Sequence, residues 1–127
     1  MRILYVEDNE PNFQLVQKIL GYDGHEVVHA GDGKIALEVA GLQRPDLVLM
    51  DLGLPGMDGY ETARRLRELP GLSGVPIAAL TASVREVDRE RAQTEGFAGF
   101  IEKPFRLDKL RREVQRLVGG KGSASRP

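Results

Sequence analysis

The 127-residue sequence contains no cysteine, and its formal net charge is only −1. Without cysteine the chain forms no disulfide, no thiolate zinc site and no thiol nucleophile. The balanced charge disfavours a nucleic-acid surface, which is usually basic. No apolar run approaches the roughly 20 residues of a membrane span, and no signal peptide precedes the first strand-like run. We therefore expect one cytoplasmic, soluble domain that contacts neither nucleic acid nor membrane directly.

Short apolar runs along the chain predict the strands of a sheet. Arg2–Val6, Leu47–Met50 and Pro76–Thr81 are apolar on both faces, which is typical of buried parallel strands. His25–Ala30 and Ala98–Glu102 carry more polar residues, so we place them at the edges of the sheet. The order 2-1-3-4-5 puts the three apolar strands in the centre, as in flavodoxin-like, doubly wound folds.

Helical patterns occupy the segments between these strands. The run Val84–Thr94 has few apolar residues, so we expect a weakly held helix there. Gly119–Pro127 lacks strong apolar residues, and we expect a disordered tail or linker stub after a domain of residues 1–118. Alternating strands and helices predict an α/β fold with right-handed crossovers. The other helices are predicted at Glu10–Tyr22, Asp32–Gly41, Gly59–Leu69 and Arg106–Val118.

Chemically active side chains stand at the carboxyl ends of four predicted strands. The carboxyl ends of parallel strands lie at one edge of the sheet, so we expect these side chains to meet in one cleft. Each of them alone could be a helix cap or a surface charge, but a single phosphate site explains all four ends together. They are Glu7 and Asp8 after the first strand, Asp51 after the third, Thr81 after the fourth and Lys103 after the fifth.

Asp51 is the candidate nucleophile. Asp58 is better placed to cap the helix Gly59–Leu69, which leaves Asp51 free to carry a phosphoryl group. Clustered carboxylates repel one another, and oxygen ligands without cysteine or a nearby histidine favour Mg²⁺ as the ion that removes this repulsion. Lys103 offers positive charge to phosphoryl oxygens, and Thr81 offers a hydroxyl donor.

The segments YVEDN, DLVLMDLGLPGMDG, ALTA and FIEKPF occur in an order and spacing that resemble response-regulator receiver domains over about Arg2–Val118. The style of the carboxyl-terminal half resembles single-domain regulators and hybrid-kinase receivers. The resemblance implies phosphorelay signal transduction by a switch, rather than by a turnover enzyme. It also implies a histidine kinase or histidine phosphotransfer protein as the phosphodonor, and a downstream protein as the target.

The resemblance assigns roles by position. It implies that Asp51 accepts the phosphoryl group from a phosphohistidine. It implies that Mg²⁺ is held by Asp8, Asp51 and the backbone carbonyl of Gly53, with Glu7 reaching the ion through water. The small residues Gly53 and Ser83 stand at the positions that tune the lifetime of the phosphate.

The same resemblance implies a conformational switch. Thr81 and Phe100 match the switch positions, although a tyrosine is frequent where Phe100 stands. The alternative is that Phe100 is a core residue of an edge strand. Lys103 and Thr81 would contact the phosphoryl group, with a cis peptide at Lys103-Pro104. The surface that changes would comprise Val84–Thr94, Ala98–Glu102 and Arg106–Val118.

Three other functions compete with this one. A phosphatase with an aspartyl-phosphate intermediate commonly carries a second Asp two residues after the nucleophile, where this chain has Gly53. A flavin binder of the same fold needs a Ser/Thr/Gly-rich loop after the first strand, where this chain has EDNEPN. A pseudo-receiver takes no phosphate, and the full set of site residues disfavours it. We interpret His25 and His29 as solvated residues of an edge strand, rather than as a metal pair.

Overall fold

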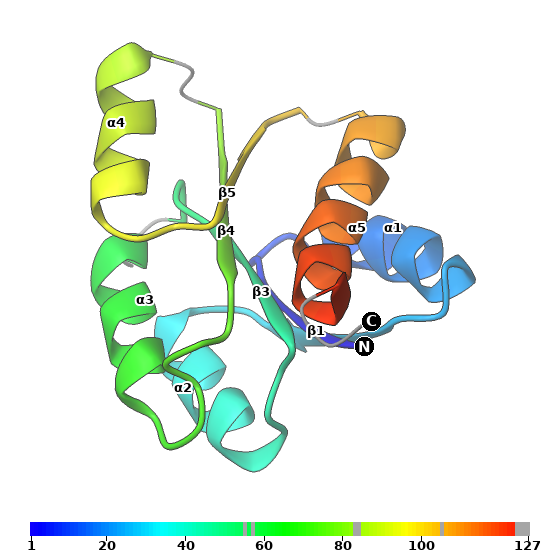
Figure 1. The fold of residues 1–127 in the computed structure, drawn as a ribbon, viewed down its shortest axis with the longest axis horizontal. Coiled ribbons are helices and arrows are strands. Elements are labelled where there is room, and N and C mark those ends of the chain that lie inside the picture. The colour runs from blue at the N-terminus through cyan, green and yellow to red at the C-terminus, as the bar shows by residue number, and fades with distance from the viewer. Residues whose placement is uncertain (55, 57, 83–84, 105, 124–127) are drawn as a thin grey trace.

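The computed structural model describes the backbone of residues 1–54, 56, 58–82, 85–104 and 106–123, with side chains up to residue 119 (Figure 1). The strands are β1 (Arg2–Val6), β2 (Glu26–Ala30), β3 (Leu47–Asp51), β4 (Ile77–Thr81) and β5 (Gly99–Glu102). The helices are α1 (Glu10–Tyr22), α2 (Gly33–Leu42), α3 (Gly59–Glu68), α4 (Glu86–Thr94) and α5 (Leu107–Ser123). The strands form one parallel sheet of order β2-β1-β3-β4-β5, which confirms the predicted fold class and strand order.

The sheet separates two apolar layers. In Figure 1, α1 and α5 lie on one side of the sheet, and α2, α3 and α4 lie on the other. Successive side chains of a strand point to opposite faces, so Leu49 of β3 joins the cluster under α1 and α5, while Met50 joins the cluster under α2 and α3. Both residues are fully buried. The central strand thus contributes to both layers, and its carboxyl end is fixed from both sides.

The helix that follows β3 begins with an aspartate cap, as the sequence predicted. Oδ1 of Asp58 accepts hydrogen bonds from the backbone N–H groups of Tyr60 and Glu61, at 3.0 and 3.2 Å. These bonds satisfy N–H groups that have no partner inside α3. Asp51, the last residue of β3, therefore does not serve as the cap of this helix.

The helix α4 has little apolar contact with the rest of the fold. Ala92 is the one residue of α4 that is buried among the described side chains. The guanidinium of Arg91 instead lies 3.9 Å from the ring centroid of Tyr60 on α3, a contact that stabilises by cation–π attraction. Such contacts are weaker than the burial of a full apolar face, so α4 is weakly held, as expected.

Four helices have ends that differ from the prediction, α2 and α3 by no more than one residue at either end and α4 and α5 by more. The helix α4 begins at Glu86 rather than at Val84, which lies outside the described residues. The helix α5 continues to Ser123, beyond the predicted end at Val118, because extending an existing helix is far easier than starting one. The division into a domain and a tail stays a prediction. No helix within the described ranges is long and apolar enough to cross a bilayer.

Leu49→Ala should destabilise the fold far more than Leu42→Ala. Leu49 is 0% exposed in the central strand, whereas Leu42, at the end of α2, is 86% exposed. The cavity left by Leu49→Ala should reduce the free energy of unfolding by about 2–5 kcal/mol. The exposed control should change it by less than about 0.5 kcal/mol. Urea unfolding followed by circular dichroism measures both, and equal losses would contradict the position of β3 in the core.

Candidate functional site

The pairing of the strands sets the spacing of the candidate residues. The backbone of β3 pairs with β1 on one side and with β4 on the other, and Asp51 stands opposite Leu80, the neighbour of Thr81. The backbone N–H of Lys103 donates to the carbonyl oxygen of Thr81 at 2.8 Å. The ends of β1, β3, β4 and β5 therefore lie along one edge of the sheet.

At this edge a single ammonium group lies between two buried carboxylates. Nζ of Lys103 is 2.6 Å from Oδ2 of Asp51 and 3.3 Å from Oε1 of Glu7. Glu7 is 1% exposed and Asp51 is 3% exposed. Three residues that are far apart in the sequence are thus joined through one ammonium group, which contacts both buried carboxylates.

The loop after β3 orients the carboxylate of Asp51. The backbone N–H of Gly53 donates to Oδ1 of Asp51 at 2.7 Å. A Cβ atom at Gly53 would lie 3.4 Å from that same oxygen, so a larger residue there would stand beside the carboxylate. Both oxygens of Asp51 are therefore engaged, Oδ1 by the loop and Oδ2 by Lys103.

The predicted site residues Thr81 and Asp8 do not share the environment of Glu7 and Asp51. Thr81 is 9% exposed at the end of β4, and Asp8 is exposed at the rim. Within the described ranges, no three Asp, Glu or His side chains are arranged to hold a metal ion. The ammonium of Lys103 instead lies between Glu7 and Asp51. Ser83 lies outside the described residues.

The donor set nevertheless fits a hard divalent cation. One ammonium faces two buried carboxylates, and Asp8 adds a third negative charge at the exposed rim. An excess of buried negative charge is costly in free energy, and a cation beside it would be stabilising. Carboxylate and carbonyl oxygens are the ligands that Mg²⁺ prefers. The chemistry of these residues therefore suits Mg²⁺ better than a softer metal.

Burial and hydrogen bonding act against one another on the charges of the site. Burial raises the pKa of Asp51 above its ordinary value, and the hydrogen bond from Lys103 only partly opposes this rise. Burial acts on Glu7 in the same direction, but hydrogen bonds from Tyr5, Lys103 and Asn12 outweigh it and hold the pKa of Glu7 low. Burial alone would lower the pKa of Lys103, yet its carboxylate partners raise it. Lys103 therefore stays protonated beside the two acids.

The sequence did not reveal Tyr5 and His29 as neighbours of the acidic residues. The hydroxyl of Tyr5 donates to Oε1 of Glu7 at 3.0 Å. Nε2 of His29 lies 2.6 Å from the carbonyl oxygen of Glu7, and its ring stacks on Phe13 with centroids 4.2 Å apart. His29 therefore lies on the edge strand β2, as expected, but it is half-buried rather than freely solvated. Strand alternation, which puts residues 5 and 7 on one face, is the signal that could have revealed Tyr5.

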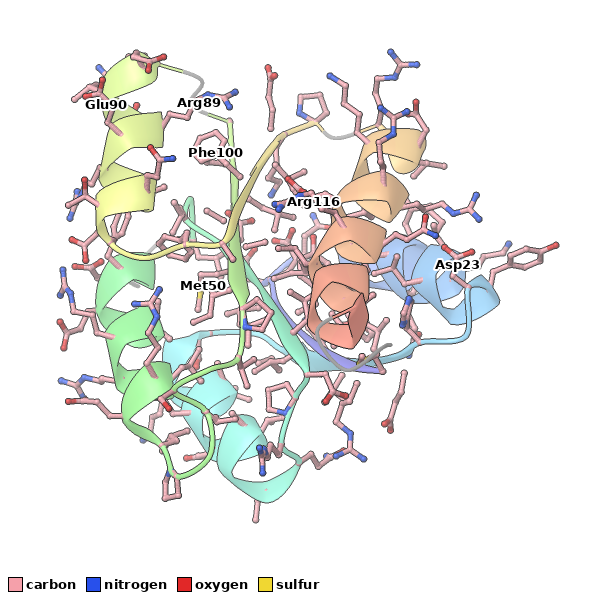
Figure 2. All side chains as sticks on the ribbon, in the orientation of Figure 1. Asp23, Met50, Arg89, Glu90, Phe100 and Arg116 are labelled. Carbon is pink, nitrogen blue, oxygen red and sulfur yellow. The ribbon has the colours of Figure 1, made fainter. Side chains whose placement is uncertain are left out.

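Phe100 connects the edge strand β5 to α4. In Figure 2 its ring and the side chain of Arg89 face one another across the space between these elements. The guanidinium of Arg89 lies 4.8 Å from the ring centroid, and the half-buried ring also packs at the margin of the cluster under α2 and α3. The Lys103-Pro104 peptide bond that follows β5 is cis, as the resemblance implied.

Comparison with known proteins gives matches over nearly the whole chain. The model of the family "Response regulator receiver domain" matches residues 3–115. The polar-differentiation response regulator DivK of Brucella anthropi is 32% identical over 117 residues, which cover 92% of this chain and 95% of that protein. The likeness therefore includes every strand end described above.

Solved structures show the same likeness in three dimensions. The receiver domain of the sensor histidine kinase PA1611 from Pseudomonas aeruginosa PAO1, solved with a magnesium ion coordinated in its active site cleft, is 39% identical with a TM-score of 0.82. This match covers 93% of the present chain and 97% of that one. Chemotaxis protein CheY4 of Vibrio cholerae is 30% identical with a TM-score of 0.86, over 91% of this chain and 97% of that one.

Lys103→Met should destabilise the protein by about 3 kcal/mol near neutral pH, because two buried carboxylates lose their cation. Without it the pKa values of Glu7 and Asp51 rise in the folded state. A carboxyl group whose pKa is higher in the folded state than in the unfolded state binds a proton more tightly when the protein is folded. The variant's loss in free energy of unfolding should therefore shrink as the pH falls from 8 toward about 4.

Chemical denaturation at several pH values measures this deficit. Lys109→Met is the matched control, since Lys109 is exposed on α5 and its loss should cost less than about 0.5 kcal/mol. A deficit for Lys103→Met that stays constant between pH 8 and pH 5 would show that Lys103 does not neutralise the two acids.

Proposed function

Since the chain belongs to the family of response regulator receiver domains, we propose that it accepts a phosphoryl group on Asp51 in a Mg²⁺-dependent reaction and acts as a phosphorelay switch. One observation carries this proposal. The buried carboxylate of Asp51 ends β3 with the ammonium of Lys103 2.6 Å away, so a nucleophile and a cation for phosphoryl oxygens stand side by side.

Phosphoryl transfer requires mainly positioning and neutralisation of charge. A carboxylate oxygen of Asp51 attacks the phosphorus, and the bond from phosphorus to the donor's imidazole nitrogen breaks. The N–H of Gly53 holds the carboxylate in place, and Lys103 and Thr81 contact the phosphoryl oxygens. Asp8, Asp51 and the carbonyl of Gly53 would hold Mg²⁺, with Glu7 acting through water, and the ion would supply further charge neutralisation.

The proposed phosphodonor is a histidine kinase or a histidine phosphotransfer protein. The 39% identical receiver domain of PA1611 is itself part of a sensor histidine kinase, which supports this class of donor. The chain then acts in the cytoplasm through contact with a downstream protein, and not through nucleic acid or membrane. It gains and loses its phosphoryl group as a switch, without turning over a free substrate.

The proposed output is a change in the surface formed by α4, β5 and α5. The hydroxyl of Thr81 turns toward the phosphoryl group, and Phe100 turns inward. The weak packing of α4, which buries only Ala92 among its described side chains, supports movement there. Gly53 and Ser83, which are small residues at the two tuning positions, are the proposed determinants of phosphate lifetime.

Incubation with a small phosphodonor such as acetyl phosphate tests the proposed reaction. Intact-mass spectrometry should show one added phosphoryl group when Mg²⁺ is present and none when EDTA removes it. Asp51→Asn should abolish the gain, because an amide is not a nucleophile for phosphorus. Asp46→Asn, at the residue before the same strand, should retain it. Equal phosphorylation of the Asp51 variant would overturn the assignment of the nucleophile.

Amide hydrogen exchange with beryllofluoride and Mg²⁺, which mimic the phosphoryl state, tests the switch. Protection should change across residues 85–103, which cover α4 and β5, because the switch moves these elements. Protection in α2, on the far side of α3, should stay the same. Identical exchange of residues 85–103 with and without beryllofluoride would contradict the proposed movement.

A further inference from the structure

We propose that Tyr5 is a positioning residue for the cation site: its buried phenol fixes Glu7 by one carboxylate oxygen and leaves the other for Mg²⁺ and its water. The inference rests on the proposed function, in which Glu7 serves the ion. Tyr5 is 0% exposed on β1, and its hydroxyl donates to Oε1 of Glu7 at 3.0 Å. A buried phenol needs such a partner, and here the partner is an acid of the site.

The donors around Glu7 converge on one of its two oxygens. Oε1 accepts from the hydroxyl of Tyr5, from Nδ2 of Asn12 at 3.3 Å and from Nζ of Lys103 at 3.3 Å. A carboxylate oxygen offers about two lone-pair sites, so three donors fill it. Within the described part of the chain, the hydrogen bond recorded for Oε2 is a long one from the N–H of Asn9, at 3.4 Å. Oε2 therefore keeps the capacity to accept from a water on the ion.

Of the three donors on Oε1, Tyr5 is the one that the core holds in place. Its ring is fully buried and packs near Phe13, with ring centroids 6.5 Å apart. Asn12 and Lys103 are only half-buried. Lys103 is also the proposed contact of the phosphoryl group, so its bond to Glu7 weakens when it turns to that group. Tyr5 then keeps the carboxylate of Glu7 in position.

The chemistry of the phenol suits this role. A neutral hydroxyl orients a carboxylate through a hydrogen bond and leaves its negative charge in place, whereas an ammonium also neutralises it. The binding of Mg²⁺ depends on the negative charge of the Glu7 carboxylate. Partners of metal-site residues that act through such a bond commonly change the metal affinity about tenfold or more when they are removed.

Tyr5→Phe removes the hydroxyl and keeps the ring, so the packing of β1 is retained. Calorimetric titration should show Mg²⁺ binding weakened about tenfold in Tyr5→Phe. Tyr22→Phe is the matched control, because Tyr22 is 87% exposed on α1, and its Mg²⁺ affinity should equal that of the unmodified chain. Addition of Mg²⁺ should also perturb the near-ultraviolet absorption of the buried phenol in the unmodified chain and in Tyr22→Phe, and this change should be lost in Tyr5→Phe.

The rate of phosphorylation by acetyl phosphate separates positioning from a merely structural role. In Tyr5→Phe the Mg²⁺ concentration for half-maximal rate should rise about tenfold, while the rate at saturating Mg²⁺ stays the same. A lower plateau with an unchanged half-saturating concentration would mean a structural role only, and would overturn the inference.

The outcomes distinguish the two proposals. If the unmodified chain and Tyr22→Phe bind Mg²⁺ and are phosphorylated, and Tyr5→Phe matches them in affinity, the role of Tyr5 is refuted and the proposed function stands. If the unmodified chain neither binds Mg²⁺ nor is phosphorylated, both proposals fail.

Discussion

The contact of one ammonium with two buried carboxylates is the interaction on which the site depends. Asp51 and Glu7 are withdrawn from water, and Lys103 is the cation that makes their burial tolerable. The same burial that raises the pKa of Asp51 keeps water away from the candidate nucleophile. A second cation and a phosphoryl group would then enter a site whose negative charge is only partly compensated, and this imbalance favours binding of Mg²⁺.

The fold and the convergence of the strand ends could be predicted from sequence, because both follow from patterns along the chain. Apolar runs identified β1, β3 and β4 as central strands, and a parallel sheet brings their carboxyl ends to one edge. Strand alternation could have placed Tyr5 and Glu7 on one face of β1, but the hydrogen bonds of Tyr5 and His29 to Glu7 depend on which way side chains turn within a layer, so they were not predicted. The extension of α5 to Ser123 was missed because the pattern there carries no apolar stripe.

The weakly packed helix α4 contacts the strand β5, which leads to the candidate site. The helix α4 is held by guanidinium groups stacked on rings, with Arg89 on Phe100 and Arg91 on Tyr60, more than by apolar burial. The ring of Phe100 belongs to β5, which ends at Glu102, the residue before Lys103. A change in the contacts of Lys103 is thus one short strand away from a helix with little apolar burial, which gives the proposed switch a physical path.

A crystal structure with Mg²⁺ and beryllofluoride bound tests the site itself. We expect the cation beside Asp8, Asp51 and the carbonyl of Gly53, with beryllofluoride on the carboxylate of Asp51 and the ammonium of Lys103 against its fluorine atoms. A structure in which Lys103 still bonds to the bare carboxylate of Asp51, with the cation bound elsewhere or absent, would contradict this arrangement.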